Sequence, residues 1–130
     1  MVHSIMIVDD NAFIRHQLRE IFDGQFDFQV CAEAENGREA VETARKVLPD
    51  VIILDLAMPV MNGLEAARII KNSQPATQII LFSNHGSIFS ESEGRSAGLP
   101  AVISKSQNVS DLVAKAREVP YRLRPVEVAA

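Results

Sequence analysis

Several side chains that could share one reaction stand where short apolar runs of the chain end. They are Asp9 and Asp10 after residues 4–8, Asp55 after 51–54, Ser83 after 78–82, and Lys105 just after 101–103. Gathered carboxylates repel one another, and a bound divalent cation relieves that repulsion. A site of oxygen ligands with few carboxylates and room for water suits Mg²⁺.

An aspartate can attack a phosphoryl group and form an acyl phosphate. The transferred group carries negative charge on its outer oxygens, so the reaction depends mainly on positioning and charge stabilisation. Mg²⁺, the Lys105 ammonium and the Ser83 hydroxyl could each hold one of these oxygens. The residue types therefore predict phosphoryl transfer to a carboxylate.

The elements that must position these residues follow from the apolar pattern. Apolar runs predict strands at 4–8, 26–34, 51–54, 78–82 and 101–103, and the second, which carries Gln29 and Glu33, has the pattern of an edge strand. Apolar residues at helical spacing lie between the runs and after the last, and Gly24, Pro49, Pro75 and Pro120 mark where these helices end. The glycine- and serine-rich stretch 83–98 predicts a weak helix.

This alternation predicts a parallel sheet covered by helices on both faces. In such a sheet, ligands bind outside the carboxyl ends of the strands. We therefore expect Asp9, Asp10, Asp55, Ser83 and Lys105 to lie in one crevice.

Composition excludes several other classes of protein. The chain has 130 residues, a net charge of −4, and one cysteine, Cys31, which is expected to be a buried, unreactive thiol. The acidic balance argues against a nucleic-acid binder. No apolar run approaches the length of a membrane span, and no basic leader precedes residues 4–8. We expect a single-domain cytoplasmic protein, whose His3, His16 and His85 lie at the surface.

Five short motifs together resemble the receiver domain of two-component response regulators, from about Met1 to about Arg117. They are Ile7–Asn11, Leu54–Pro59, Met61–Gly63, Ile80–Ser83 and Ser104–Lys105. The resemblance implies a flavodoxin-like (βα)5 fold, a doubly wound parallel sheet with strand order 2-1-3-4-5. It places a receiver domain at 1–119 and a tail or linker at 120–130.

The resemblance also implies a role for each site residue. Asp55 would accept the phosphoryl group, and Asp10, Asp55 and the backbone carbonyl of Ala57 would bind Mg²⁺ directly. Asp9 would bind the metal through water, Ser83 would supply the switch hydroxyl, and Lys105 would bind phosphate. The donor would be a histidine kinase or phosphotransfer protein, and the protein would be a regulatory phospho-acceptor, not a turnover enzyme.

Two positions depart from the receiver pattern. Val102 stands where receivers usually have Phe or Tyr, so the usual aromatic read-out of the switch is missing. Ser106 replaces a common proline and, with residues 64–68, resembles the LuxR-type, NarL-like subgroup that carries a DNA-binding domain. The length leaves no room for that domain, so we expect no direct nucleic-acid binding. We expect an output partner of unknown identity. The sequence does not decide whether the protein forms a homodimer.

Three other functions compete with this interpretation. A pseudo-receiver, a protein-interaction module that takes no phosphate, is favoured by Val102 and opposed by the intact acids and Lys105. A phosphatase of the haloacid-dehalogenase type needs a second acid where Ala57 stands. A flavodoxin needs a Ser/Thr-rich phosphate loop where Asp9 and Asp10 stand.

Overall fold

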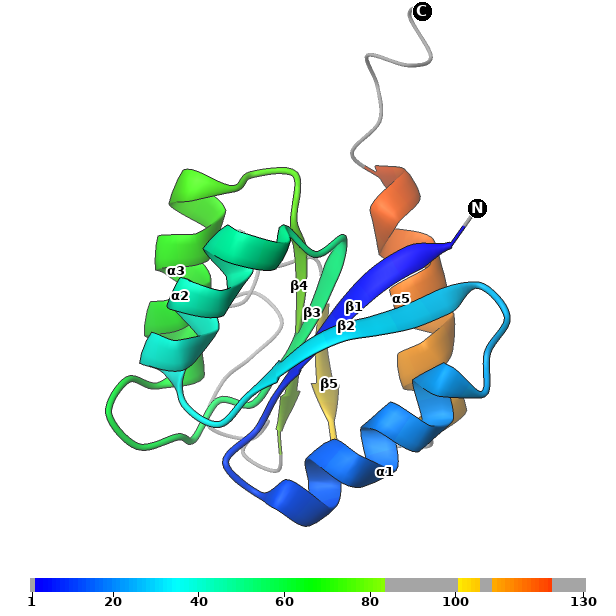
Figure 1. Cartoon of the computed structure of the whole chain (residues 1–130), viewed down its shortest axis with the longest axis horizontal. Coiled ribbons are helices and arrows are strands. Elements are labelled where there is room, and N and C mark those ends of the chain that lie inside the picture. Colours follow the sequence, from blue (N-terminus) through cyan, green and yellow to red (C-terminus); the bar gives the residue numbers. More distant parts are fainter. Residues whose placement is uncertain (1, 84–100, 106–108, 123–130) are drawn as a thin grey trace, which may run out of the picture.

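The protein is built around a five-stranded parallel sheet in the order β2-β1-β3-β4-β5 (Figure 1). The structure is a computed structural model and describes residues 2–83, 101–105 and 109–122. The strands are β1 His3–Val8, β2 Phe28–Ala34, β3 Val51–Leu54, β4 Gln78–Ser83 and β5 Ala101–Ser104. The predicted sheet and its strand order are confirmed.

The described helices cover both faces of this sheet. They are α1 Ala12–Asp23, α2 Gly37–Val47, α3 Gly63–Ser73 and α5 Val109–Arg122. In Figure 1, α1 and α5 lie on one face and α2 and α3 on the other. The weak helix expected within 83–98 falls, from residue 84 on, outside the described residues. None of the described helices combines the length and apolar character needed to cross a membrane.

Alternate residues of the central strands feed two separate cores. From β1, Ile5 and Ile7 pack with residues of α1 and α5, whereas Met6 and Val8 pack with residues of α2 and α3. Each fully buried Ile or Met contributes about 1.5–3 kcal/mol relative to an exposed side chain. Because β1 is packed on both faces, the backbone position of Asp9 and Asp10, which follow it, is fixed by the core.

Asparagine caps set where three loops turn into helices. Asn11, Asn36 and Asn62 precede α1, α2 and α3, and each side-chain oxygen accepts a backbone N–H of the first turn. Such a cap satisfies a donor that the helix leaves unpaired and is worth about 1 kcal/mol. The helices that they cap all begin at the end of the molecule where the strands end (Figure 1).

Two predicted boundaries were wrong. Helix α5 continues through Pro120 to Arg122, because proline this close to a helix end removes few backbone bonds and the fully buried Val119 anchors the preceding turn. Strand β2 begins at Phe28, two residues later than predicted, because Phe26 lies in a turn and is 90% exposed.

Two side chains also differ from expectation. His3 is buried, and its Nδ1 lies 3.7 Å from Asp50 Oδ2. Cys31 is exposed because it lies on β2, the edge strand. Partial desolvation nevertheless raises the pKa of this thiol, which keeps it protonated and poorly reactive near neutral pH.

Candidate phosphoryl-acceptor site

The sheet itself positions the backbone of three charged residues. Each stands one residue beyond a strand, and its N–H still donates to the last carbonyl of the neighbouring strand. The three bonds are Asp9 N to Ala34 O (3.1 Å), Asp55 N to Val8 O (2.9 Å) and Lys105 N to Ser83 O (3.1 Å). These residues are therefore fixed by the ladder that holds the sheet together.

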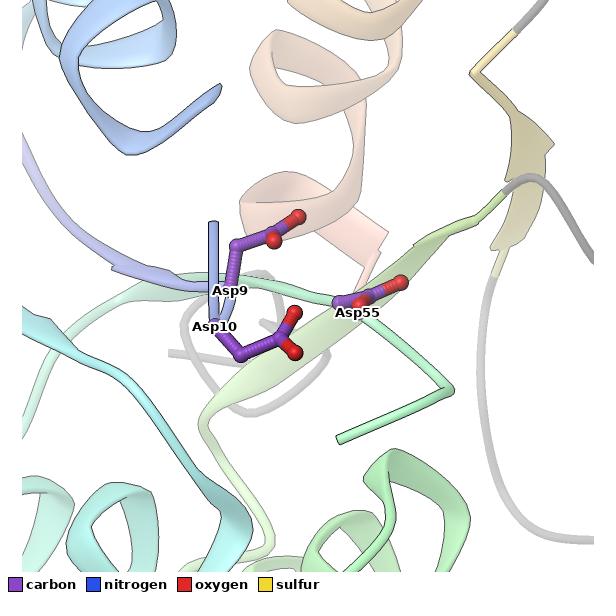
Figure 2. A group of neighbouring side chains, drawn as sticks. All are labelled: Asp9, Asp10 and Asp55. Carbon is purple, nitrogen blue, oxygen red and sulfur yellow. The ribbon is translucent and has the colours of Figure 1, made fainter. Parts of the chain in front are cut away.

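The three carboxylates gather at this edge, with Asp9 and Asp10 coming from the end of β1 and Asp55 from the end of β3 (Figure 2). One oxygen of each carboxylate lies within 4.8 Å of the others. Asp9 and Asp55 are only 2% and 5% exposed, whereas Asp10 is exposed. The cluster therefore has two buried acids and one that faces solvent.

Lys105 places a positive charge between the two buried acids. Its Nζ lies 2.6 Å from Asp9 Oδ2 and 3.4 Å from Asp55 Oδ1. The same side chain lines a groove with apolar residues of α1 and with Phe82 and Val109, so its methylene stem can rest on apolar surface while the ammonium reaches the acids. The cation offsets part of the repulsion between Asp9 and Asp55.

The negative charge of Asp55 is only partly stabilised by its surroundings. Burial raises the pKa of its carboxyl group, the negative charge of Asp9 adds to this, and Lys105 opposes it. A buried carboxylate with a raised pKa is a stronger base and nucleophile than a solvated one, and it gains from any further positive charge at the site.

Asp9 is held at every polar atom. Besides its N–H, its Oδ1 accepts from Asn11 N (2.9 Å), its Oδ2 accepts from Lys105, and its carbonyl accepts from Arg15 Nη1 (2.7 Å). The motifs that predict the site do not include Arg15. One signal in the sequence could have indicated Arg15. It is a cation in the helix that directly follows Asp9 and Asp10, and the predicted edge strand carries an acidic residue, Glu33, that could pair with it.

Two glycines bring the loop after Asp55 into place. Gly63 donates its N–H to Leu56 O (2.8 Å), and a Cβ at Gly63 would lie 2.0 Å from the Asp55 carbonyl oxygen. Gly37 donates its N–H to Met61 O (3.1 Å), and a Cβ at Gly37 would lie 2.3 Å from that Met61 carbonyl oxygen. Any larger residue at either position would force the backbone of this loop to shift.

The remaining predicted site residues adjoin this cluster, Ser83 through its ladder bond with Lys105 and Ala57 through its place in the chain after Asp55. Ser83 is buried at the end of β4 and pairs in register with Ser104 of β5. Ala57 lies in the loop two residues after Asp55 and is exposed. The backbone of Val102 pairs with Leu81, while its side chain, like residues 85 and 106, falls outside what the structure describes.

The donor set fits a hard cation. It consists of carboxylate oxygens within 4.8 Å of one another, one of them on the solvent-facing Asp10, which leaves an approach for water and phosphate oxygens. Oxygen ligands that retain water are characteristic of Mg²⁺ sites.

The comparisons with known proteins agree with this geometry. The profile of the response regulator receiver domain matches residues 5–117. A protein-glutamate methylesterase/protein-glutamine glutaminase of Paramagnetospirillum magneticum is 40% identical over 121 residues, 89% of this chain and 34% of that protein. A similar protein of Idiomarina loihiensis is 43% identical over 84 residues, 65% of this chain and 22% of its own. The chain thus spans about a third or less of these curated relatives.

Solved structures show the same fold. The response regulator domain of Thermotoga maritima CheB superposes with a TM-score of 0.85 at 32% identity, covering 93% of this chain and 98% of that one. A LuxR-family two-component response regulator from Aurantimonas gives a TM-score of 0.86 at 28% identity, covering 95% and 89%. With a profile match over most of its length and this shared fold, the chain belongs to the response regulator receiver domain family.

Proposed function

We propose that this chain is a phosphorylatable receiver that accepts a phosphoryl group on Asp55 in a Mg²⁺-dependent reaction. The observation that carries the proposal is the gathering of Asp9, Asp10 and Asp55, with the Lys105 ammonium against Asp9 and Asp55. The donor would be a phosphohistidine of a histidine kinase or phosphotransfer protein. The phosphorylated receiver would signal to an output partner or domain in the cytoplasm.

In this reaction an Asp55 carboxylate oxygen attacks phosphorus, forming one P–O bond as the P–N bond to imidazole breaks. The imidazole leaves with the bonding electron pair and takes up a proton. Bound Mg²⁺ would supply positive charge to the oxygens of the transferred group. Asp10, Asp55 and the Ala57 carbonyl would hold the metal directly, and Asp9 through water.

The other residues would act on the transferred group itself. Lys105 lies 3.4 Å from Asp55, so a modest shift of its ammonium away from Asp9 would let it bind a phosphoryl oxygen. The Ser83 hydroxyl, at the end of the adjacent strand, would hold another. None of the groups would need to move its backbone out of the sheet ladder.

The direct test is intact-mass spectrometry after incubation with Mg²⁺ and a small acyl- or amido-phosphate donor. We expect one phosphoryl adduct on the wild-type chain and none on Asp55→Asn, while Asp23→Asn at the exposed end of α1 serves as the matched control. If the wild type takes no adduct from any donor, the protein acts as a pseudo-receiver. Phosphate release over many rapid turnovers would indicate a phosphatase.

The metal role has its own test, thermal unfolding with and without Mg²⁺. A ligand at a hundred times its Kd adds about 2.7 kcal/mol of stability, or roughly 10 °C in Tm for a domain of this size. We expect this rise for the wild type and a much smaller one for Asp10→Asn, whose carboxylate faces solvent. Equal rises in both proteins would exclude Asp10 as a ligand.

A further inference from the structure

We infer that Arg15 is a positioning residue for the acidic cluster, and that Glu33 at the edge of the sheet holds it in place. This inference rests on the proposed Mg²⁺-dependent function and adds to it a connection from α1 and β2 to the metal-binding acids. Three observations carry it: a contact to the backbone of Asp9, a contact to Glu33, and the low exposure of the Arg15 side chain.

The first observation is the bond from Arg15 Nη1 to the carbonyl oxygen of Asp9, 2.7 Å long. This carbonyl belongs to the peptide unit that joins Asp9 to Asp10. Its orientation therefore sets the direction in which Asp10 leaves the strand. Asp10 is the solvent-facing member of the cluster, and among the hydrogen bonds described none holds its carboxylate in place.

The second observation is the anchor on the far side of the guanidinium. Arg15 Nε lies 3.3 Å from Glu33 Oε1, and Arg19 Nη1 lies 2.5 Å from Glu33 Oε2. Glu33 belongs to β2 and pairs in register with Ile7, two residues before Asp9. The Glu33 carboxylate thus fixes the guanidinium of Arg15 relative to β1, the strand that leads to Asp9 and Asp10.

Burial makes the arrangement selective. The Arg15 side chain is 17% exposed, against 44% for Arg19, so the Arg15 bonds compete less with water. A fixed guanidinium can hold two acceptors at once in a geometry that an ammonium does not reproduce. Arg15 and Arg19 share a helix, a charge and an acceptor, but of the two only Arg15 has a described bond to Asp9.

The charge of Arg15 and its positioning role predict opposite changes in Mg²⁺ affinity when Arg15 is replaced by a neutral residue. Removing a positive charge near the acids would strengthen the binding of a cation, because Coulomb repulsion falls. Releasing the Asp9–Asp10 peptide would weaken it, because the ligands would have to be ordered during binding. Residues that orient metal ligands typically contribute 10- to 100-fold in affinity, so we expect positioning to dominate.

The experiment measures Mg²⁺ affinity by isothermal titration calorimetry for the wild type, Arg15→Met and Arg19→Met. We expect about tenfold weaker binding for Arg15→Met and wild-type affinity for the matched control Arg19→Met. In the phosphoryl-acceptance assay, Arg15→Met should need correspondingly more Mg²⁺ for half-maximal labelling, yet reach the wild-type extent at saturating Mg²⁺. A general loss of structure would lower that extent instead.

Arg15→Met affinity equal to or tighter than that of the wild type would overturn the inference, as would equal weakening in Arg19→Met. If circular dichroism shows that Arg15→Met does not fold, Arg15→Lys decides, with weaker binding in support and wild-type affinity against. A wild type that binds no Mg²⁺ would refute the metal role in the proposed function. A wild type that binds normally beside an unaffected Arg15→Met refutes only the role of Arg15.

Discussion

The Lys105 ammonium lies closer to Asp9 than to Asp55: the two N–O distances are 2.6 Å and 3.4 Å. The cation is therefore shared unequally between two carboxylates that are both buried. This leaves Asp55 with less compensation than its neighbour and is consistent with the raised pKa of its carboxyl group. The residue proposed to accept phosphate carries a charge that the folded protein only partly stabilises.

The first prediction concerns Asp55→Asn in the absence of Mg²⁺. Because folding raises the pKa of Asp55 above its ordinary value near 3.8, its contribution to stability is largest below that value. The contribution is lost as the pH rises through the folded-state pKa. The neutral variant escapes this loss, so at pH 7 its Tm should exceed that of the wild type by roughly 3 °C.

Thermal unfolding followed by circular dichroism at pH 7 and near pH 3, with a chelator present, checks this expectation. The difference between the two proteins should shrink at the lower pH, where wild-type Asp55 is protonated. Asp23→Asn, at an exposed position, should follow the wild type at both values. A less stable Asp55→Asn at pH 7 would show that the Lys105 contact outweighs burial.

The second prediction concerns the loop that follows Asp55. In Gly63→Ala, the new Cβ would lie 2.0 Å from the Asp55 carbonyl oxygen, a distance that forces the backbone to move. We expect a loss of more than about 2 kcal/mol in the free energy of unfolding, together with loss of phosphoryl acceptance. Gly24→Ala is the matched control, because its Cβ meets atoms no closer than 3.4 Å. Urea denaturation measures both, and similar stabilities for the two variants would contradict the prediction.

The third prediction concerns Val60, which has a φ of 71°. Met61 N donates to Pro59 O across it at 2.7 Å, which makes a tight three-residue turn that is strained for a β-branched residue. The side chain is 75% exposed, so Val60→Gly loses little packing.

Relief of this strain should exceed the entropy that glycine adds to the unfolded chain. We expect Val60→Gly to raise the free energy of unfolding by about 0.5–1 kcal/mol. Val47→Gly replaces the same residue type in the last turn of α2, and it should lower stability by about 1 kcal/mol instead. If Val60→Gly is also destabilised, the strain is not relieved by glycine.

The fourth prediction concerns the opposite end of the sheet. Arg117 of α5 binds both oxygens of Asp27, at 2.5 and 3.0 Å, and lies over the Phe28 ring. Its hydrogen bond lowers the pKa of Asp27. The stability that this pair provides is therefore present above the ordinary pKa of the carboxyl group and is lost as the pH falls through the lowered one.

Arg117→Met should consequently cost about 1 kcal/mol at pH 7 and progressively less as the pH falls below the ordinary pKa of an Asp carboxyl group. Lys115→Met is the control on the same helix, because its contact with Glu118 is a 3.4 Å surface pair and should contribute less than about 0.5 kcal/mol. Denaturant unfolding across this pH range measures the difference, and a loss of stability independent of pH would refute the ionic contribution.

Much of the fold and the cluster of acids could be predicted from the sequence because both depend on local patterns. Apolar runs placed the strands, and a polar residue directly after a run must lie at the carboxyl end of the sheet. Asp9, Asp10 and Asp55 were found in this way. The burial of His3 and the role of Arg15 depend on residues distant in the chain, so no local pattern reveals them. The continuation of α5 through Pro120 shows packing outweighing a local stop signal.

The ladder bonds made by the backbone N–H groups of Asp9, Asp55 and Lys105 have a consequence for hydrogen exchange. These amide hydrogens can reach solvent only when the adjoining strand ends separate, so they should exchange more slowly than those of the surrounding loops. The backbone of these three site residues thus opens only together with the strand ends that carry it. Any response to phosphate must be expressed by side chains and by the loops beyond the ladder, where amide exchange can change while these three positions stay protected.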